Sequence, residues 1–167
     1  MISIAPARTE EDFETCASFC RALGELDVAQ GKAFGVPADL IIGLYHGQTG
    51  DSLAEKFGSA NASMLIANWN GTAAGCIGLA AFDTEAGEIH KFYVDPAFRG
   101  RRIGHALMTA ALEVISRAAH RKALVHTAIY MTQAVTLYEA FAFRRCEPFR
   151  PVPEAIRHTE IFFCRSI

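Results

Sequence analysis

The chain has 167 residues, of which 51% are hydrophobic and 20% charged, a balance that favours a folded globular protein over a disordered one. Its net charge of −2 provides no global positive field, which argues against nucleic acid or an anionic membrane surface as a partner. No apolar run approaches the roughly 20 residues that cross a bilayer, and no basic leader precedes an apolar stretch at the N-terminus. We therefore expect one cytoplasmic domain over residues 1–167.

The alternation of apolar patterns and turn residues predicts helices and strands in mixed order. Thr9, with Asp12 three residues later, forms a capping box that opens a first helix. Pro37 is placed to open a second helix, and Asn70-Gly71 predicts a tight hairpin turn. The expected elements are a strand from Ile2, helices from Thr9 to about Leu23 and over Ala38–Tyr45, a surface loop over residues 46–63 with a short helix near Asp51–Phe57, strands Met64–Trp69, Thr72–Ala81 and Glu88–Val94, a helix over 102–118, a strand Ala123–Ala128, a helix Thr132–Phe141, and strands near 143–147 and 159–164.

The five cysteines and six histidines show no spacing typical of a metal site. No Cys-x-x-Cys pair is present, and Cys16 and Cys20 are four residues apart, which places both on one helix face. We expect reduced thiols that pack as small apolar side chains, and no metal.

The segment that joins the strand ending at Val94 to the helix over 102–118 is the most informative part of the chain. It reads Val94-Asp95-Pro96-Ala97-Phe98-Arg99-Gly100-Arg101-Arg102-Ile103-Gly104-His105. A helix start opened by glycine leaves backbone N–H groups unpaired, and the helix dipole favours an anion there. The three arginines add positive charge that can bind phosphate oxygens in a forked geometry. The sequence therefore predicts a turn that binds a diphosphate.

The motif at this turn narrows the choice of cofactor. The Gly-x-Gly-x-x-Gly fingerprint of dinucleotide sites and the Gly-Lys-Ser/Thr ending of a P-loop are both absent. The segment resembles the signature of the GNAT superfamily of acetyl-CoA-dependent N-acetyltransferases, Arg/Gln-x-x-Gly-x-Gly/Ala after a strand that ends in Val-x-Pro. Arg99 takes the first signature position and Gly104 the last, while Arg102 replaces the middle glycine; Arg101-x-x-Gly104-x-Ala106 fits as a second register. We expect Arg102 to adopt the right-handed helical backbone region, with its guanidinium pointing outward.

A second signature of the same superfamily follows downstream. The segment Met131 to Phe143 resembles the family's helix that carries Leu-Tyr and ends in Gly-Phe, with Leu137-Tyr138 and Ala142-Phe143 at those places. The N-terminal strand and helix and the closing stretch also fit, so the resemblance covers nearly the whole chain. It implies an α/β fold with a mixed, mostly antiparallel central sheet flanked by helices, and acetyl-CoA as cosubstrate.

The resemblance also implies which residues bind the cofactor. In this family the backbone N–H groups at Phe92 and Val94 polarise the thioester carbonyl and pair with the pantetheine arm. Because that pairing requires an open strand edge, we expect a splay or a bulge there. The expected cofactor-binding residues are Phe92, Tyr93, Val94, Arg99, Gly100, Arg101, Arg102, Ile103, Gly104 and His105.

Two residues are expected to carry the chemistry. The family often has a glutamate that acts as general base eleven residues before the first signature position, which is Glu88 here. The structural alternative is a strand-edge glutamate exposed to solvent. Tyr138 matches the family residue that hydrogen-bonds the CoA sulfur and protonates the departing thiolate, and its alternative is a core tyrosine. His90 shares a strand face with Glu88, so Glu88, His90 or water remain open as the base.

The expected reaction is N-acetyl transfer to a primary amine of a small molecule or of a peptide or protein N-terminus, by direct attack in a ternary complex. One alternative is a non-catalytic acyl-CoA-binding or sensor module, and another is a structural protein with a vestigial turn. The sequence leaves the amine unidentified, and the resemblance allows a homodimer.

Overall fold

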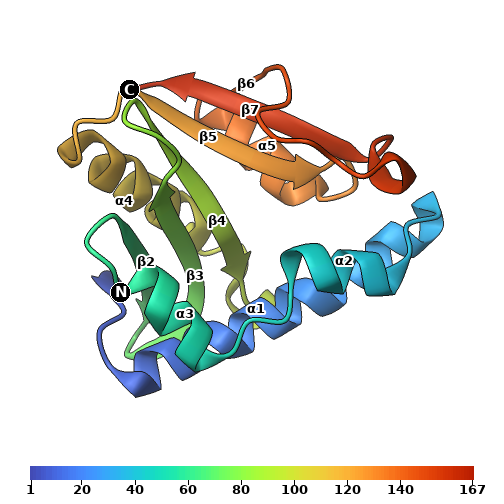
Figure 1. Ribbon diagram of the computed structural model, residues 1–167. Helices are drawn as coiled ribbons and strands as arrows, with labels where there is room; N and C mark the ends of the chain where they lie inside the picture. The colour runs from blue at the N-terminus through green and yellow to red at the C-terminus, as the bar shows by residue number, and fades with distance from the viewer.

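The computed structural model describes residues 1–167 and contains a seven-stranded sheet with helices on both faces (Figure 1). The strands are β1 (Ile2–Pro6), β2 (Ala62–Trp69), β3 (Thr72–Ala81), β4 (Ala86–Val94), β5 (Lys122–Ala128), β6 (Arg144–Arg145) and β7 (Glu160–Ser166). The helices are α1 (Glu10–Gly31), α2 (Ala38–Tyr45), α3 (Gly50–Phe57), α4 (Ile103–Arg117) and α5 (Thr132–Ala140), with 3-10 helices at Lys32–Phe34, Pro96–Phe98 and Glu154–Ile156. The strand order is β1-β2-β3-β4-β5-β7-β6, and only β4 and β5 are parallel neighbours. The predicted mixed, mostly antiparallel sheet flanked by helices is confirmed.

Local sequence signals account for most of these elements. Asn70 and Gly71 have φ angles of 49° and 85°, the left-handed pair that a two-residue hairpin turn needs between β2 and β3. The capping box is also formed, because the Asp12 backbone N–H donates to Thr9 Oγ1 at 3.1 Å and the Thr9 N–H donates to the Asp12 carboxylate at 2.9 Å. Most predicted boundaries agree with the structure to within two residues.

The first helix is the main difference. It was expected to end near Leu23, but α1 continues eight residues further, to Gly31. Gly24 lies inside this helix at a point of close packing, since a Cβ atom there would lie only 3.1 Å from Cγ of His46. The chain leaves helical geometry only at Gly35, whose φ is 72°. No helix of the structure combines the length and the apolar content of a membrane span.

The sheet separates two apolar cores. On the face covered by α4 and α5, Leu107 and Met108 of α4 pack with Phe143 and Phe163. On the other face, α1 and α3 pack against β2 and β3, and Cys16, Cys20 and Cys76 are buried among them as predicted, all with free thiols; Cys146 and Cys164 are half-buried. The two cores fix the sheet between α4 and α1.

The sheet opens between β4 and β5. These strands pair only where Ala86–Ile89 lies beside Lys122–Val125, after which they diverge in a V (Figure 1). The pairing of β3 with β4 shifts register between Cys76 and Gly78, and Lys91 on β4 has a φ of 51°, which marks a bulge. The expected splay and bulge are therefore both present. Helices α1 and α2 cross the open end of the V.

Candidate active site

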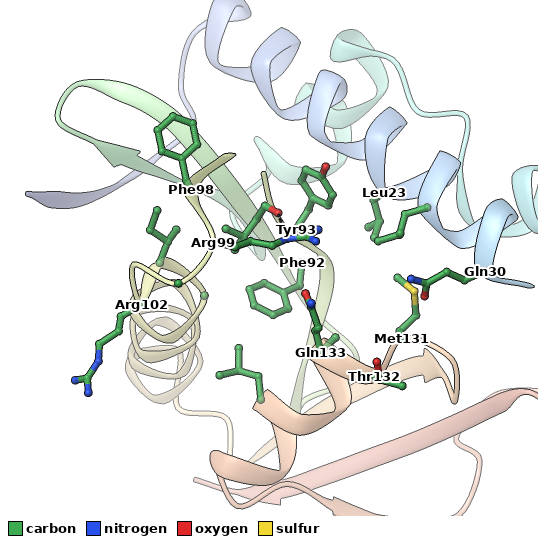
Figure 2. A pocket seen from close by; sticks show the side chains of 17 residues that line it. Leu23, Gln30, Phe92, Tyr93, Phe98, Arg99, Arg102, Met131, Thr132 and Gln133 are labelled. Atoms are coloured by element: carbon green, nitrogen blue, oxygen red, sulfur yellow. Dashed lines mark hydrogen bonds between the residues drawn. The ribbon is translucent and has the colours of Figure 1, made fainter. Parts of the chain in front are cut away.

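A groove of about 420 Å³ lies between the end of β4, the turn that follows it, α1 and α5 (Figure 2). The strand and the turn contribute one wall, and the two helices contribute the other. The groove is lined by Phe92, Tyr93, Val94, Phe98, Arg99, Gly100, Arg102, Ile103 and Gly104, by Leu23, Leu26 and Gln30 of α1, and by Met131, Thr132, Gln133, Ala134 and Leu137. The predicted cofactor-binding residues therefore gather along one wall, with Arg101 and His105 outside it.

The turn uses two residues in the left-handed region. Gly100 has a φ of 77°, and Arg102, which caps the start of α4, has a φ of 61° and a ψ of 18°. The expected right-handed geometry at Arg102 is therefore wrong. Arg99 is extended, and the chain reverses from it into α4 within three residues, which requires a positive φ where the family signature has glycine. A non-glycine residue there costs on the order of 1–2 kcal/mol. The Arg102 guanidinium does point away from the groove, as expected (Figure 2).

The same turn leaves a series of backbone donors unpaired. The N–H groups of residues 100–102 donate to no backbone carbonyl, and the hydrogen-bond ladder of α4 begins only where the Ala106 N–H meets the Arg102 carbonyl at 3.0 Å. No side chain caps the helix start. Successive N–H groups at the positive end of a helix dipole form an anion-binding site of the kind that diphosphates occupy.

The three arginines differ in what their side chains contact. Arg99 lies in the groove, where its Nε donates to the Val94 carbonyl at 3.3 Å (Figure 2). The Arg101 guanidinium stacks over Trp69, 4.9 Å from the ring centroid, so it is engaged outside the groove. His105, the other predicted residue outside the groove, packs its ring against Phe141, with the ring centroids 4.7 Å apart. Arg99 is therefore the arginine best placed to contact a phosphate.

Replacing Arg99 with alanine should weaken acetyl-CoA binding by about 1.5–3 kcal/mol, or roughly tenfold to a hundredfold, the range for a charge-assisted hydrogen bond. Isothermal titration calorimetry measures the change. Arg117→Ala is the matched control, because Arg117 lies exposed at the far end of α4 in a surface ion pair with Glu113. Equal affinities for Arg99→Ala and the wild type would contradict the assignment of the phosphate site.

A polar cavity of about 250 Å³ adjoins the groove at the open end of the V. The two share Leu23, Phe92, Met131 and Ala134 in their linings, so they meet beside the end of β4. The polar and charged residues that line this cavity are Asp27, Tyr45, His46, Gln48, Lys56, Glu88, His90, Lys91, His126, Thr127, Tyr138, Arg150 and Glu160. No group of three or more His, Cys, Asp or Glu side chains is arranged to hold a metal ion.

Glu88 lies inside the polar cavity and is not a solvent-exposed edge residue. Only 4% of it is exposed, and its carboxylate accepts a hydrogen bond from Nη2 of Arg150. His90 shares the strand face, as predicted, with its Nε2 at 3.4 Å from the same carboxylate. Arg150 was not predicted as a site residue, because it lies 62 positions away in the connection between β6 and β7 and carries no motif.

His90 is held neutral by its surroundings. Burial, followed by the nearby charges of Lys56 and Arg150, lowers the pKa of His90 from 6.5 to about 3. At neutral pH the imidazole beside Glu88 is therefore uncharged.

This shift makes the stability of the fold depend on pH. Between pH 6.5 and about 3 the unfolded chain binds a proton at His90 that the native protein does not, so the free energy of unfolding falls as the pH decreases through this range. The slope due to His90 should be about 1 kcal/mol per pH unit. Urea unfolding at pH 7, 6 and 5 should show a shallower slope for His90→Gln than for the wild type. Identical slopes for His90→Gln and the wild type would refute the assignment.

Tyr138 lies on α5 at the wall of the polar cavity. Its ring packs among Phe92, Phe143 and Phe163, with centroid distances of 5.8–6.1 Å, and it is 4% exposed. Burial raises the pKa of the Tyr138 phenol, so the hydroxyl keeps its proton at neutral pH. The ring is thus a core residue, as the structural alternative proposed, and the residue also lines the cavity that holds Glu88.

A hydrogen-bond network that the sequence did not reveal closes the far side of the polar cavity. The Asp27 carboxylate accepts from the Tyr130 hydroxyl at 2.5 Å and lies 2.8 Å from Nε2 of His46. These residues come from α1, from the turn after β5 and from the segment after α2. Asp27 was missed because α1 was expected to end before it.

Comparison with known proteins agrees with this geometry. The sequence profile of the Acetyltransferase (GNAT) family matches residues 40–143. An uncharacterized N-acetyltransferase of Schizosaccharomyces pombe is 29% identical over 105 residues, which cover 60% of this chain and 64% of that protein. The IAA acetyltransferase of Azospirillum brasilense is 38% identical over 90 residues, covering 52% of this chain and 58% of that one. The match thus spans about three fifths of the length of these relatives.

Solved structures share the fold across the whole chain. The PaiA N-acetyltransferase of Thermoplasma acidophilum, in complex with coenzyme A, has a TM-score of 0.74 at 14% identity and covers 100% of this chain and 99% of that one. A GNAT-family acetyltransferase of Staphylococcus aureus Mu50 has a TM-score of 0.73 at 16% identity, with 99% of each chain covered. Because the family profile matches more than half of the sequence, including β4, the turn after it, α4 and α5, the chain belongs to the GNAT family of acetyltransferases.

Proposed function

We propose that this protein, acting as one domain over residues 1–167, transfers an acetyl group from acetyl-CoA to a primary amine of a small molecule or of a peptide N-terminus. The observation that carries the proposal is the junction of the groove and the polar cavity beside Phe92, with Glu88 and Tyr138 both lining the cavity. A cofactor arm in the groove and an amine in the cavity would meet there. The complex of the PaiA enzyme with coenzyme A supports this choice of cosubstrate.

The residues of the groove fit acetyl-CoA. The unpaired N–H groups of residues 100–105 and the Arg99 side chain would hold the diphosphate, and the edge of β4 beyond Ile89 would pair with the pantetheine arm. Gly104 allows α4 to pack closely against Phe92, since a Cβ atom at this position would lie 3.2 Å from Cζ of Phe92. These contacts would direct the thioester towards the polar cavity.

The chain would supply three contributions to a direct transfer. Glu88 accepts the proton that the acceptor ammonium loses, and the neutral nitrogen then bonds to the thioester carbonyl carbon. The backbone N–H of Phe92 stabilises the charge that develops on the carbonyl oxygen. The carbon–sulfur bond breaks as Tyr138 donates a proton to the departing thiolate sulfur. The acetylated nitrogen loses its second proton, which restores the phenol, and the proton on Glu88 passes to solvent. The products are the N-acetylated amine and the CoA thiol.

Release of free CoA thiol, measured against a panel of primary amines, tests the proposal. An enzyme should release CoA with at least one amine at a rate well above hydrolysis in the absence of amine. A non-catalytic acyl-CoA sensor would be stabilised by acetyl-CoA, by about 2.7 kcal/mol at 100 times Kd, without releasing thiol for any amine. A protein with a vestigial turn would show neither thiol release nor a change in its melting curve.

A further inference from the structure

The ion pair between Glu88 and Arg150 places opposite charges side by side in the polar cavity. The Glu88 side chain is 5% exposed and the Arg150 side chain 32% exposed, so the arginine lies nearer to solvent. Glu88 is held by β4, and Arg150 comes from the connection that precedes β7. The pair therefore links β4 to the connection between β6 and β7.

Arg150 has hydrogen-bonding capacity that the protein does not use. Its guanidinium donates to Glu88 through Nη2 and to no other group of the chain. Two aromatic rings fix its position, with the guanidinium carbon 5.2 Å from the centroid of Phe149 and 5.9 Å from that of Phe82. A planar guanidinium with free N–H groups is the side chain best matched to a carboxylate.

The other charged side chains of the cavity already have partners. Asp27 is bonded to Tyr130 and His46, and Glu160 lies 2.7 Å from Nε2 of His126. Lys91 donates to the Tyr45 carbonyl, and burial lowers the pKa of its amine. Lys56 is exposed and lies over the Phe57 ring. Arg150 is therefore the cation of this cavity whose guanidinium is held in place and still has free N–H groups.

We propose that the acceptor is a free α-amino acid, whose amino group meets Glu88 while its α-carboxylate binds Arg150. An α-amino acid carries its ammonium and its carboxylate on one carbon, and the ion pair presents the two complementary charges in contact. A peptide N-terminus has a neutral amide at the place of the carboxylate, and a simple amine has no group there. A cavity of about 250 Å³ also suits a small acceptor, because pockets for larger ligands measure roughly 300–1,000 Å³.

The inference rests on the proposed function, and its step is the same transfer. The α-ammonium gives a proton to Glu88, and its nitrogen bonds to the acetyl carbon. The carbon–sulfur bond breaks as the thiolate takes a proton from Tyr138, and the second proton lost by the nitrogen restores the phenol. The α-carboxylate takes no part in bond making and stays on Arg150. The products are an N-acetyl amino acid and CoA thiol.

The experiment compares matched acceptors that differ only in the carboxylate. Each amino acid of a standard panel is assayed beside its decarboxylated amine and its amide, for example tyrosine, tyramine and tyrosinamide. For the preferred side chain, kcat/KM should be about tenfold to a hundredfold higher for the amino acid than for either analogue, the range for charge-assisted hydrogen bonds. Equal values for all three acceptors would overturn the inference while leaving acetyl transfer intact.

The variants assign this preference to Arg150. In Arg150→Gln the ratio of kcat/KM between the amino acid and its amine should fall to about one, mainly through a higher KM for the amino acid. The ratio cancels any general effect that the variant has on Glu88, and Arg150→Lys, which keeps the charge without the fork, should give an intermediate ratio. Arg157→Gln, at an exposed arginine of the same connection, should keep the wild-type ratio. A preference that persists in Arg150→Gln would refute the assignment.

Failure of catalysis can be told apart from failure of this inference. If no acceptor releases CoA from the wild type, the panel is titrated calorimetrically into protein saturated with CoA. An amino acid that binds the wild type but not Arg150→Gln would support the site even though the transfer reaction is wrong. Absence of amino-acid binding would overturn it.

Discussion

Tyr138→Phe should lower kcat for acetyl transfer by about 10²–10⁴-fold and leave the affinity for acetyl-CoA close to that of the wild type. The substitution removes only the hydroxyl, since a phenylalanine ring can keep the packing against Phe92, Phe143 and Phe163. Burial alone raises the pKa of this phenol, so the proton needed by the departing thiolate is present at neutral pH. Without it, the thiolate must leave unprotonated or take a proton from water.

Steady-state kinetics and calorimetry separate the two possible roles of the hydroxyl. The free energy of unfolding should change little, which chemical denaturation verifies, so a fall in kcat cannot be attributed to loss of fold. A variant with normal kcat at saturation and a raised KM for acetyl-CoA would show that the hydroxyl anchors the cofactor and is not the acid.

Glu88→Gln should lower kcat/KM for the acceptor by a similar factor, about 10²–10⁴-fold, because glutamine keeps the shape of the side chain but cannot accept the ammonium proton. Acetyl-CoA binding should be unchanged, since Glu88 lines the polar cavity and not the groove. The side-chain oxygen of glutamine can still accept from Arg150, so the position of the arginine is retained.

The pH profile identifies the base. Glu88→Gln should depress the acidic limb of the rate profile, because without a general base only the free amine reacts, and its fraction falls as the pH decreases. His90→Gln, the neighbouring control, should keep the wild-type acidic limb, because His90 with a pKa near 3 is already neutral across the accessible range. The reverse pattern would assign the base to His90, and full activity in both variants would leave water as the acceptor of the proton.

The sequence predicted those parts of the protein that depend on short-range rules. The Asn70-Gly71 hairpin and the capping box at Thr9 follow from residues within a few positions of one another, and both are present. The unpaired backbone donors of the turn before α4 could also be predicted, because they belong to consecutive residues.

Contacts between distant segments were beyond such rules. The first helix was expected to end near Leu23, but Gly24 lies inside α1 and packs closely against His46, which lies 22 positions later. The extra length of α1 brings Asp27 into the polar cavity. Arg150 likewise gains its place only because the connection before β7 returns to β4. At Arg102, the need to reverse the chain within three residues outweighed the ordinary backbone preference of arginine.

The splay between β4 and β5 has a consequence for solubility as well as for chemistry. A strand edge with unpaired backbone groups is a template on which another chain can add a strand and begin to aggregate. Here the edge of β4 beyond Ile89 must stay open if a cofactor is to pair with it. Helices α1 and α2 cross that opening and block the approach of another strand. The groove that remains between α1 and β4 still has room for a narrow molecule. Shortening α1 to end near Leu23 would therefore expose the edge of β4 and favour aggregation through strand pairing.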